Sequence, residues 1–581
     1  MPGVTETNTH NRAEFLKKLM GQATEQATQS GSGVANLVSE KGLSPYKGEW
    51  GEKQVLHLLR RSLFSVKQDE LRYFSKRNLH QCLDELFAPI PAPSPPINAY
   101  NNGEHSDPHV PAGQTWVNAT YGPLPPGFTP AMRMSLIDSF RRFSLKGWWA
   151  GLMVHQKPNI TDKMLLFWHT AISTQMKQVM DARYSYKHLM LLHSHALGNF
   201  KQLIRQVSTD PQMLVYQNGN TNTASAPNEN YARELQELFT VGKGPGSHYT
   251  EEDVRTAARV LTGWVDNFTS IDSTNVSSGF LPEQHDTGDK KFSAFYNNTI
   301  IKGRTGADGA KELDDLVNMI FATTETARAL CRKLYRYFVY YNIDDTVEKN
   351  VITPLAHMLV AKNFEVKGVV RTLLSSEHFF DEKNMGCIIK SPAELVAGMI
   401  RQFNVQIPGD SDYVKQYKSW IELANLMENM DMNIGDPPSV AGWAAYYQKP
   451  QFHEFWINSD TLSTRNGVTE TFLSKEGYTE NGVLLKLDYL KFTAGLSNPA
   501  NPGQLISDSV RFLCPVAFDD VQLNYVKKQF LLSGQSDDSY WSEAWNKYIA
   551  NPGNPEALSE VDSRLQRYYV YLLSRAEYQL I

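Results

Sequence analysis

A mainly α fold is predicted for this 581-residue chain by two features of its sequence. Apolar residues recur at helical spacing over most of its length, as at Leu313, Leu316, Val317 and Ile320. The sequence also shows neither a sustained alternation of strand and helix patterns nor a repeat of fixed period. We therefore expect one large multi-helix unit with long loops and at most a minor β-hairpin, for which residues 295–301 are the candidate.

Composition divides the chain into an N-terminal arm and a helical domain. Residues 1–50 are rich in Gly, Ser, Thr, Gln and Glu, which predicts a mobile arm. Residues 51–581 carry the helical patterns and form the predicted domain. Within that domain, residues 89–130 hold 11 of the 29 prolines. Because proline removes a backbone donor and fixes φ, this segment is expected to be a long loop.

The overall charge and the cysteines argue against several classes of protein. With 62 acidic and 57 basic residues, the net charge of -5 gives no general attraction for nucleic acid. No run of about eighteen apolar residues is present, so a membrane span is not expected. The four cysteines lie far apart without CxxC spacing, which predicts neither a zinc ribbon nor a dense disulfide framework.

The first residues do not form an export signal that we would expect to function. Residues 11–18 resemble a twin-arginine signal, but Ala13 stands where the second arginine would be. The residues that follow are too polar for the apolar region of such a signal. The compartment of the protein is therefore not predicted.

The stretch APNENYARELQELF at residues 226–239 places two asparagines, three glutamates and one arginine in a single expected helix start. Asn228 is the expected N-cap, and Gly242 is placed to end the helix. Glu229, Arg233 and Glu237 follow at i, i+4 and i+8 on the face opposite the apolar residues. If this ladder is exposed, it contributes only a few tenths of a kcal/mol per pair. An exposed ladder and a functional face are equally compatible with the spacing.

The next helix is expected to begin at Thr250 and carries a similar polar stripe of Glu251, Arg255 and Arg259. The two stripes could face water or face each other across a cleft. An arginine beside a carboxylate favours the ionised carboxylate, which suits a metal ligand or a base better than a general acid.

Histidines supply a second set of candidates. His285 and Asp286 are adjacent in a polar segment, where they could act as a base or as ligands on a loop. His169 lies near apolar positions of its helix, and such a histidine is more often a hydrogen-bonded core residue than a ligand. On a later helix His193 falls within the apolar arc, whereas His188 falls outside it.

Known catalytic signatures are missing or incomplete. A single Asp-Thr-Gly triplet at residues 286–288 lacks the second copy that aspartic proteases require. The segment GKGPG at residues 242–246 follows a helix and lacks the spacing of a phosphate-binding loop. Neither HExxH nor GxSxG occurs.

An ordered set of motifs nevertheless resembles a bacterial family called domain of unknown function 1800. The matching segments cover about residues 52–581: HLLRRSLF (57–64), LFWH (166–169), ALGNF (196–200), DP (210–211), NENYAREL (228–235), ELFTVG (237–242), YTEEDV (249–254), ARVLTGW (258–264), HD (285–286), KSPAE (390–394), PPSVAGW (437–443), WIN (456–458) and LLSRAEYQ (572–579).

The resemblance implies one large, mainly helical unit, but it implies no reaction and no agreed catalytic residues. Members of the family often look exported, a pattern from which this sequence departs at Ala13. They are also often encoded beside a family resembling alkaline phosphatases and sulfatases, which makes such a protein a candidate partner.

Two functional hypotheses follow from the residues. The first is a hydrolase or transferase acting on a polar substrate, with a carbohydrate as the candidate, and with a divalent metal as a candidate cofactor. Its expected residues are Glu229, Arg233, Glu237, His285 and Asp286 for catalysis, Asn228, Asn230 and Trp264 for substrate binding, and His169 as a candidate metal ligand. The second is a noncatalytic binding or assembly protein in which the same cluster is a buried structural network.

Overall fold

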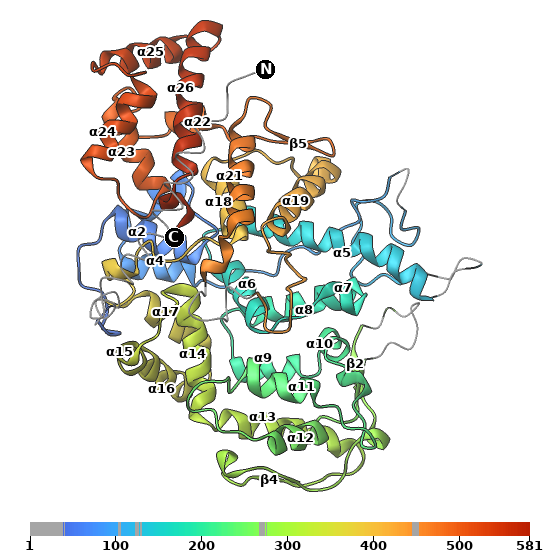
Figure 1. Cartoon of the computed structure of the whole chain (residues 1–581). Coiled ribbons are helices and arrows are strands. Elements are labelled where there is room, and N and C mark those ends of the chain that lie inside the picture. Colours follow the sequence, from blue (N-terminus) through green and yellow to red (C-terminus); the bar gives the residue numbers. More distant parts are fainter. Residues whose placement is uncertain are drawn as a thin grey trace.

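Helices form nearly all of the regular structure in the computed structural model of the chain, as Figure 1 shows. The structure describes residues 39, 41–102, 106–122, 127, 130–266, 274, 276–443 and 453–581. Most of the expected N-terminal arm, residues 1–38 and 40, and the suspected signal at residues 11–18 lie outside this part. The predicted mainly α class is confirmed.

The described residues up to Phe239 contain ten α-helices. They are α2 (Glu52–Ser62), α3 (Gln68–Phe74), α4 (Leu79–Leu86), α5 (Pro130–Val154), α6 (Thr161–Ala171), α7 (Met176–Val179), α8 (Ala182–Ser194), α9 (Phe200–Val207), α10 (Pro211–Tyr216) and α11 (Glu229–Glu234), followed by the π-helical segment η3 (Leu235–Phe239).

The remaining α-helices begin with α12. They are α12 (Glu251–Val260), α13 (Glu312–Phe321), α14 (Thr324–Phe338), α15 (Asp345–Val347), α16 (Thr353–Ala361), α17 (Val366–Leu374), α18 (Pro392–Gln402), α19 (Tyr413–Glu428), α21 (Ser459–Leu473), α22 (Tyr489–Ala494), α23 (Pro502–Leu513), α24 (Asp520–Val526), α25 (Ser539–Ala550) and α26 (Pro555–Leu573). Two further π-helical segments are η7 (Glu348–Ile352) and η11 (Lys527–Leu531).

Strands are few and short in the described part of the chain. Three antiparallel pairs are formed by β1 (Trp264–Asp266) with β2 (Ser278–Phe280), β3 (Lys290–Lys291) with β4 (Ile300–Ile301), and β5 (Tyr478–Glu480) with β6 (Val483–Leu485). The candidate hairpin at residues 295–301 therefore supplies only one strand, and its partner strand precedes it. Between these strands, residues 294–296 form a 3-10 turn, η5.

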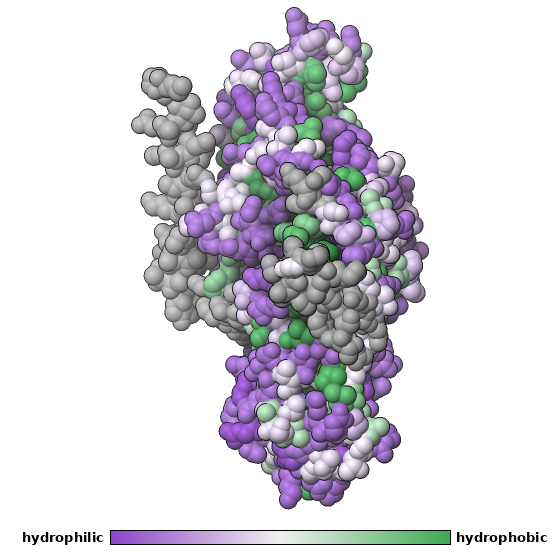
Figure 2. Space-filling view, turned by 90° about the vertical axis from the view of Figure 1, so that its right-hand side faces the viewer, coloured by the Kyte–Doolittle hydropathy of each residue, from purple (hydrophilic) through white to green (hydrophobic). Residues whose placement is uncertain are grey.

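One continuous core joins these helices. Its buried apolar side chains run from Val55 in α2 to Tyr578 beside the C-terminus. The core reaches from the C-terminal helices α22–α26 at one end of the molecule to α9, α11, α12 and α13 at the other, with α5, α6 and α8 between them (Figure 1). The face seen in Figure 2 is mostly hydrophilic, with hydrophobic residues in small patches.

The proline-rich segment after α4 contains no helix or strand in its described residues and lies along α5. Trp148 donates its indole N–H to the carbonyl oxygen of Ser94 at 2.7 Å, and Ser144 donates to the carbonyl of Ile97 at 2.8 Å. Side chains of α5 thus satisfy carbonyl groups of a segment whose prolines leave it few backbone donors.

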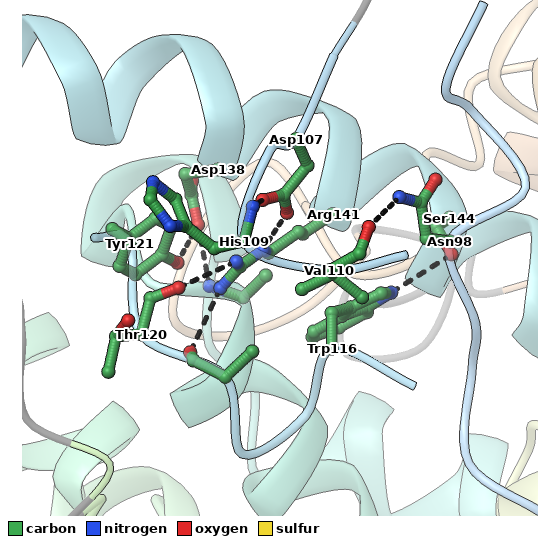
Figure 3. A network of polar contacts seen from close by, with 12 residues as sticks. Asn98, Asp107, His109, Val110, Trp116, Thr120, Tyr121, Asp138, Arg141 and Ser144 are labelled. Carbon is green, nitrogen blue, oxygen red and sulfur yellow. Dashed lines mark hydrogen bonds and ion pairs between the residues drawn. The ribbon is translucent and has the colours of Figure 1, made fainter. Parts of the chain in front are cut away.

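A buried ionic network holds the far end of the same segment, as Figure 3 shows. Arg141 of α5 donates to Asp107 at 2.8 Å and to the carbonyl oxygens of Ala119 and Thr120 at 3.1 and 2.8 Å. The Arg141 and Asp107 side chains are fully buried, so loss of either one would leave the other as an unpaired charge inside the protein. The loop is therefore a specifically bonded part of the fold.

The residues just before α2 also pack on the domain. Pro45 forms a backbone bridge with Ser376, and the Tyr46 ring lies 4.6 Å from that of Phe380 between centroids. Trp50 donates its indole N–H to the carbonyl of Arg77 at 2.7 Å.

Candidate functional site

Residues 228–242 begin as the sequence predicts and then depart from a regular helix. Asn228 is the N-cap of α11, and its side chain accepts a hydrogen bond from the N–H of Asn230 at 2.9 Å. After one and a half turns the helix widens into the π-helical segment η3. A π turn adds a residue to the turn, so Glu237 is rotated away from the i+8 position of the expected ladder. Gly242, at φ +81, follows the segment.

Arg233 is the centre of a charged cluster between α11 and α12. It donates to both carboxylate oxygens of Glu251, at 2.9 and 2.7 Å, and to Glu229 at 3.0 Å. Arg255 of α12 reaches Glu229 at 3.7 Å. The two polar stripes therefore face each other and are paired. They do so at the surface, because 33% of the Arg233 side chain and 64% of the Glu251 side chain are exposed.

Glu237 belongs to a different contact. Among the described residues its ion-pair partner is Lys243, which lies beyond the end of the π segment. The neighbouring residue Gln236 is buried and accepts a hydrogen bond from Tyr296 at 2.7 Å. The π turn thus places an amide in the core and leaves Glu237 half-buried beside a surface lysine.

His285 and Asp286 lie in a separate, more deeply buried network. Asp286 accepts two hydrogen bonds from Arg259 of α12, at 2.7 and 3.0 Å. The Nδ1 atom of His285 lies 2.9 Å from the carbonyl oxygen of Thr262, and its Nε2 atom lies 3.2 Å from Glu312. A carbonyl oxygen only accepts, so Nδ1 carries the proton of this contact.

Lys290 and Glu312 close this second network. Their side chains are fully buried and form an ion pair at 2.6 Å. Burial alone would raise the pKa of Glu312, but interactions with His285, Lys290 and the N–H of Arg304 hold it below its usual value. Burial likewise opposes the ionised form of Asp286, and Arg259 with the N–H of Gly288 keeps its pKa low.

The expected substrate-binding residues do not converge on either network. Asn230 is exposed, and Asn228 is occupied as a cap. Trp264 begins β1, where its ring lies 5.2 Å from that of Phe280 and 5.9 Å from the guanidinium of Arg205. The structure thus brings Asn228, Glu229 and Arg233 together, and His285 with Asp286, as two groups along α12.

His169 is buried at the end of α6 rather than exposed to a ligand-bearing surface. Its ring packs edge-on against Trp149, with centroids 5.0 Å apart, and against Trp443 at 5.8 Å. Burial, with a smaller contribution from nearby His188, lowers its pKa to about 3. Neither ring nitrogen of His169 has a hydrogen-bond partner in the described part of the chain.

His188 is also buried, contrary to the interpretation of its position on the helix. The helix α8 is covered on more than one side, by α6, α9, α10 and α5, so a position outside the main apolar arc is still inside the protein. Its Nδ1 atom lies 2.8 Å from the carboxylate of Asp210. The sequence offers no direct signal for this pairing, because the two residues are 22 positions apart.

Known metal-site geometry is not found in the part of the chain that the structure describes. Those residues contain no group of three or more His, Cys, Asp or Glu side chains that could hold an ion. Searched over the same residues, no helix has the length and apolar character to cross a membrane.

Comparison with known proteins gives a family and nothing more specific. A family model described as a protein of unknown function matches residues 57–580, nearly the whole chain. No curated protein and no solved structure matches the chain.

Proposed function

The chain belongs to the DUF1800 family, and from that premise we propose that it is a noncatalytic binding or assembly protein. The observation that carries the proposal is the closure of the Arg233 cluster, in which Glu229 and Glu251 occupy the guanidinium. An arginine that orients a substrate must keep donors free for it. Here those donors serve to join α11 to α12.

The ionisation of the other candidates supports the same role. The pKa values of Glu251, Asp286 and Glu312 are all lowered, the first chiefly by the hydrogen bond from Arg233. A general acid at neutral pH requires the opposite shift. These carboxylates are therefore poor general acids, and each is held in an ion pair with a neighbouring arginine or lysine.

One observation favours the alternative of a hydrolase or transferase. Burial, with a smaller contribution from the neighbouring Glu237, raises the pKa of Glu234. A raised carboxyl pKa beside a second carboxyl group is a feature of acid and base pairs in enzymes. This alternative places its catalysis on Glu237.

Turnover measurements with the full-length protein distinguish the two functions. Chromogenic phosphate esters, acetyl esters and glycosides are assayed with the wild type and with Glu237→Gln. The matched control is Glu252→Gln, which changes an exposed acid paired with Arg255. We expect no turnover in any of them. Turnover that falls about a hundredfold or more in Glu237→Gln alone, with an unchanged unfolding midpoint, would establish the enzyme instead.

The assembly role has a surface that supports it. At the C-terminal end of the molecule, Val521 and Tyr525 of α24 are 78% and 56% exposed, and Tyr540 and Ile549 of α25 are about half exposed. Exposed large apolar residues are common at interaction sites when they gather. We propose a phosphatase- or sulfatase-like protein as the partner. Light scattering of a mixture is expected to give the summed mass, and separate elution contradicts this assembly.

A further inference from the structure

A cavity of about 510 Å³ lies between the segment that precedes α2 and the loop that follows α17. The two segments run alongside each other and are joined by backbone hydrogen bonds, such as that from the N–H of Tyr46 to the carbonyl oxygen of Ser375 at 2.9 Å. The volume is within the range of about 300–1,000 Å³ that is usual for small-molecule sites. The cavity is lined by Lys41, Tyr46, Gly48, Gln54, Glu377, Phe380, Asp381, Glu382, Lys383 and Met385.

Two aromatic rings contribute to the lining of this cavity. The ring centroids of Tyr46 and Phe380 lie 4.6 Å apart, and Met385 is a further apolar residue of the lining. Glycine at position 48 leaves room for the first ring, because a Cβ there would lie 2.6 Å from Cζ of Tyr46. Burial and then the charge of Glu377 raise the pKa of Tyr46, so a carboxylate lies close to this ring. The faces of such rings carry partial negative charge and attract an organic cation.

Two partly buried carboxylates, those of Glu377 and Asp381, line the same cavity and are held in place by other groups. Glu377 accepts a hydrogen bond from the backbone N–H of Lys47 at 2.7 Å, and Asp381 accepts one from the hydroxyl of Ser39 at 2.8 Å. Burial opposes the ionised form of Asp381, but hydrogen bonds, first among them that from the backbone N–H of Lys383, hold its pKa below the usual value. The cavity therefore offers fixed negative charge beside its aromatic rings.

The ammonium group of Lys41 shows where a cation lies relative to these carboxylates. It is 3.8 Å from Glu377 and 3.9 Å from Asp381, and is thus beyond hydrogen-bonding distance of both. The Lys41 side chain is 49% exposed, whereas those of Glu377 and Asp381 are 24% and 14% exposed. Long ion pairs of an exposed lysine contribute little stability. This ammonium group can therefore move into solvent and leave its position to another one.

We propose that this cavity binds a primary ammonium group on an apolar stem, supplied by a free alkylamine or by the lysine side chain of a partner protein. The ammonium group replaces that of Lys41 between the two carboxylates, and the stem lies against the rings of Tyr46 and Phe380. Charge favours a cation, because the lining holds three carboxylates and two ammonium groups. The site shares no residue with the Arg233 cluster and does not depend on the function proposed above.

The same lining disfavours an anion and a metal ion. An anion would meet the carboxylates of Glu377 and Asp381 and be repelled. A calcium ion takes about six to eight oxygen ligands, whereas the described residues hold no group of three or more His, Cys, Asp or Glu side chains placed for a metal. An alkylammonium group has three donors and an apolar stem, so it can use both the carboxylates and the rings.

Calorimetry with the full-length protein tests the site. The probes are pentylamine and an acetylated lysine methylamide with a free side-chain amine, and pentanol and pentanoate are the uncharged and anionic counterparts. We expect saturable binding of an amine, weakened about tenfold in Glu377→Gln, which keeps an acceptor for the N–H of Lys47 but loses the charge. Lys41→Gln should instead bind the amine about tenfold more tightly, because it removes the competing ammonium group. The matched control is Glu229→Gln, which changes a partly exposed carboxylate of α11 outside the cavity and should leave binding unchanged.

A second measurement uses the wild type and does not depend on the folding of these variants. In the methionine methyl NMR spectrum, a bound amine is expected to shift the signal of Met385 and leave that of Met153, a core residue, in place. Tighter binding of pentylamine identifies a free amine as the ligand, and tighter binding of the lysine derivative identifies a protein side chain. Absence of saturable amine binding, equal binding of pentanol, or equal affinities of the wild type, Glu377→Gln and Lys41→Gln overturns the site.

Discussion

Arg233 and Glu251, eighteen residues apart, form a two-bond ion pair that joins the polar faces of two helices. The sequence shows two acid and arginine stripes, and the pair shows that each stripe is the partner of the other. Because both side chains reach solvent, the pair acts as a local link between α11 and α12 at the surface.

Exchange of the two charges tests this link. Arg233→Glu alone places three acidic groups together and is expected to lower the unfolding midpoint. Adding Glu251→Arg restores opposite charges across the helices and should recover most of that loss. Thermal unfolding in low salt and in about 1 M NaCl measures both, since salt screens an exposed pair. A double variant no more stable than the single one would contradict the pairing.

Substitution in the buried pair of Lys290 and Glu312 should change the stability far more than substitution in the exposed pair of Arg233 and Glu251. Glu312→Gln removes the nearer carboxylate from the fully buried ammonium of Lys290 and leaves that of Asp286, at 3.8 Å, as the remaining partner, and we expect a loss of about 3 kcal/mol in the free energy of unfolding. Urea unfolding measures the change. The control, Glu229→Gln, removes an exposed partner and should change stability by about 1 kcal/mol or less.

Removing both charges of this pair separates charge from packing. Lys290→Met with Glu312→Leu is expected to be more stable than Glu312→Gln alone, because no unpaired charge remains in the core. If the double variant is the less stable of the two, the hydrogen bond that Glu312 accepts from the backbone N–H of Arg304 matters more than the ion pair.

Whether a contact in this fold could be predicted from the sequence depends on how far apart its two residues lie along the chain. The helix starts at Asn228 and Thr250 were predictable, since the capping side chain and the backbone N–H from which it accepts lie within three residues. The pairing of His285 with Glu312 was not, because it requires the packing of a loop on α13 across 27 positions. A short segment of sequence is enough to predict a helix cap, but it does not show which distant residue a side chain will contact.

The π-helical segment η3 is a second feature that the sequence pattern could not predict. The expected ladder assumed 3.6 residues per turn throughout, and η3 breaks that period at residues 235–239. Nothing in the spacing of apolar residues separates a π turn from an α turn over so short a stretch. As a result Glu229 and Arg233 pair as the spacing predicts, while Glu237 pairs with Lys243.

Asp162 predicts a dependence of stability on pH in the neutral range. Burial raises its pKa to about 7, opposed by the positive charge of Arg401. The folded state therefore binds a proton more tightly than the unfolded state, so this contribution is fully present below about pH 4 and is lost as pH rises through about 7. Asp162→Asn should abolish it, and the stability of the variant relative to wild type should grow by up to about 1.4 kcal/mol per pH unit across that window. Urea unfolding at several pH values would show parallel curves if Asp162 is not the cause.

His169→Phe is expected to preserve or raise the free energy of unfolding of the protein. Its ring nitrogens have no partners in the described structure, so the change removes two unsatisfied polar atoms and keeps the aromatic contacts with Trp149 and Trp443. The pKa of His169 is lowered to about 3, so the unfolded state binds its proton more readily. The part of the free energy of unfolding that depends on the protonation of His169 is therefore fully present above about pH 6.5 and is lost as pH falls toward 3. The advantage of the variant should grow on acidification over this range, as measured by urea unfolding. His57→Phe, which loses a hydrogen bond to Phe379, should instead be less stable than wild type at neutral pH. If His169→Phe is destabilised as much as His57→Phe, then His169 is an ordinary hydrogen-bonded core residue.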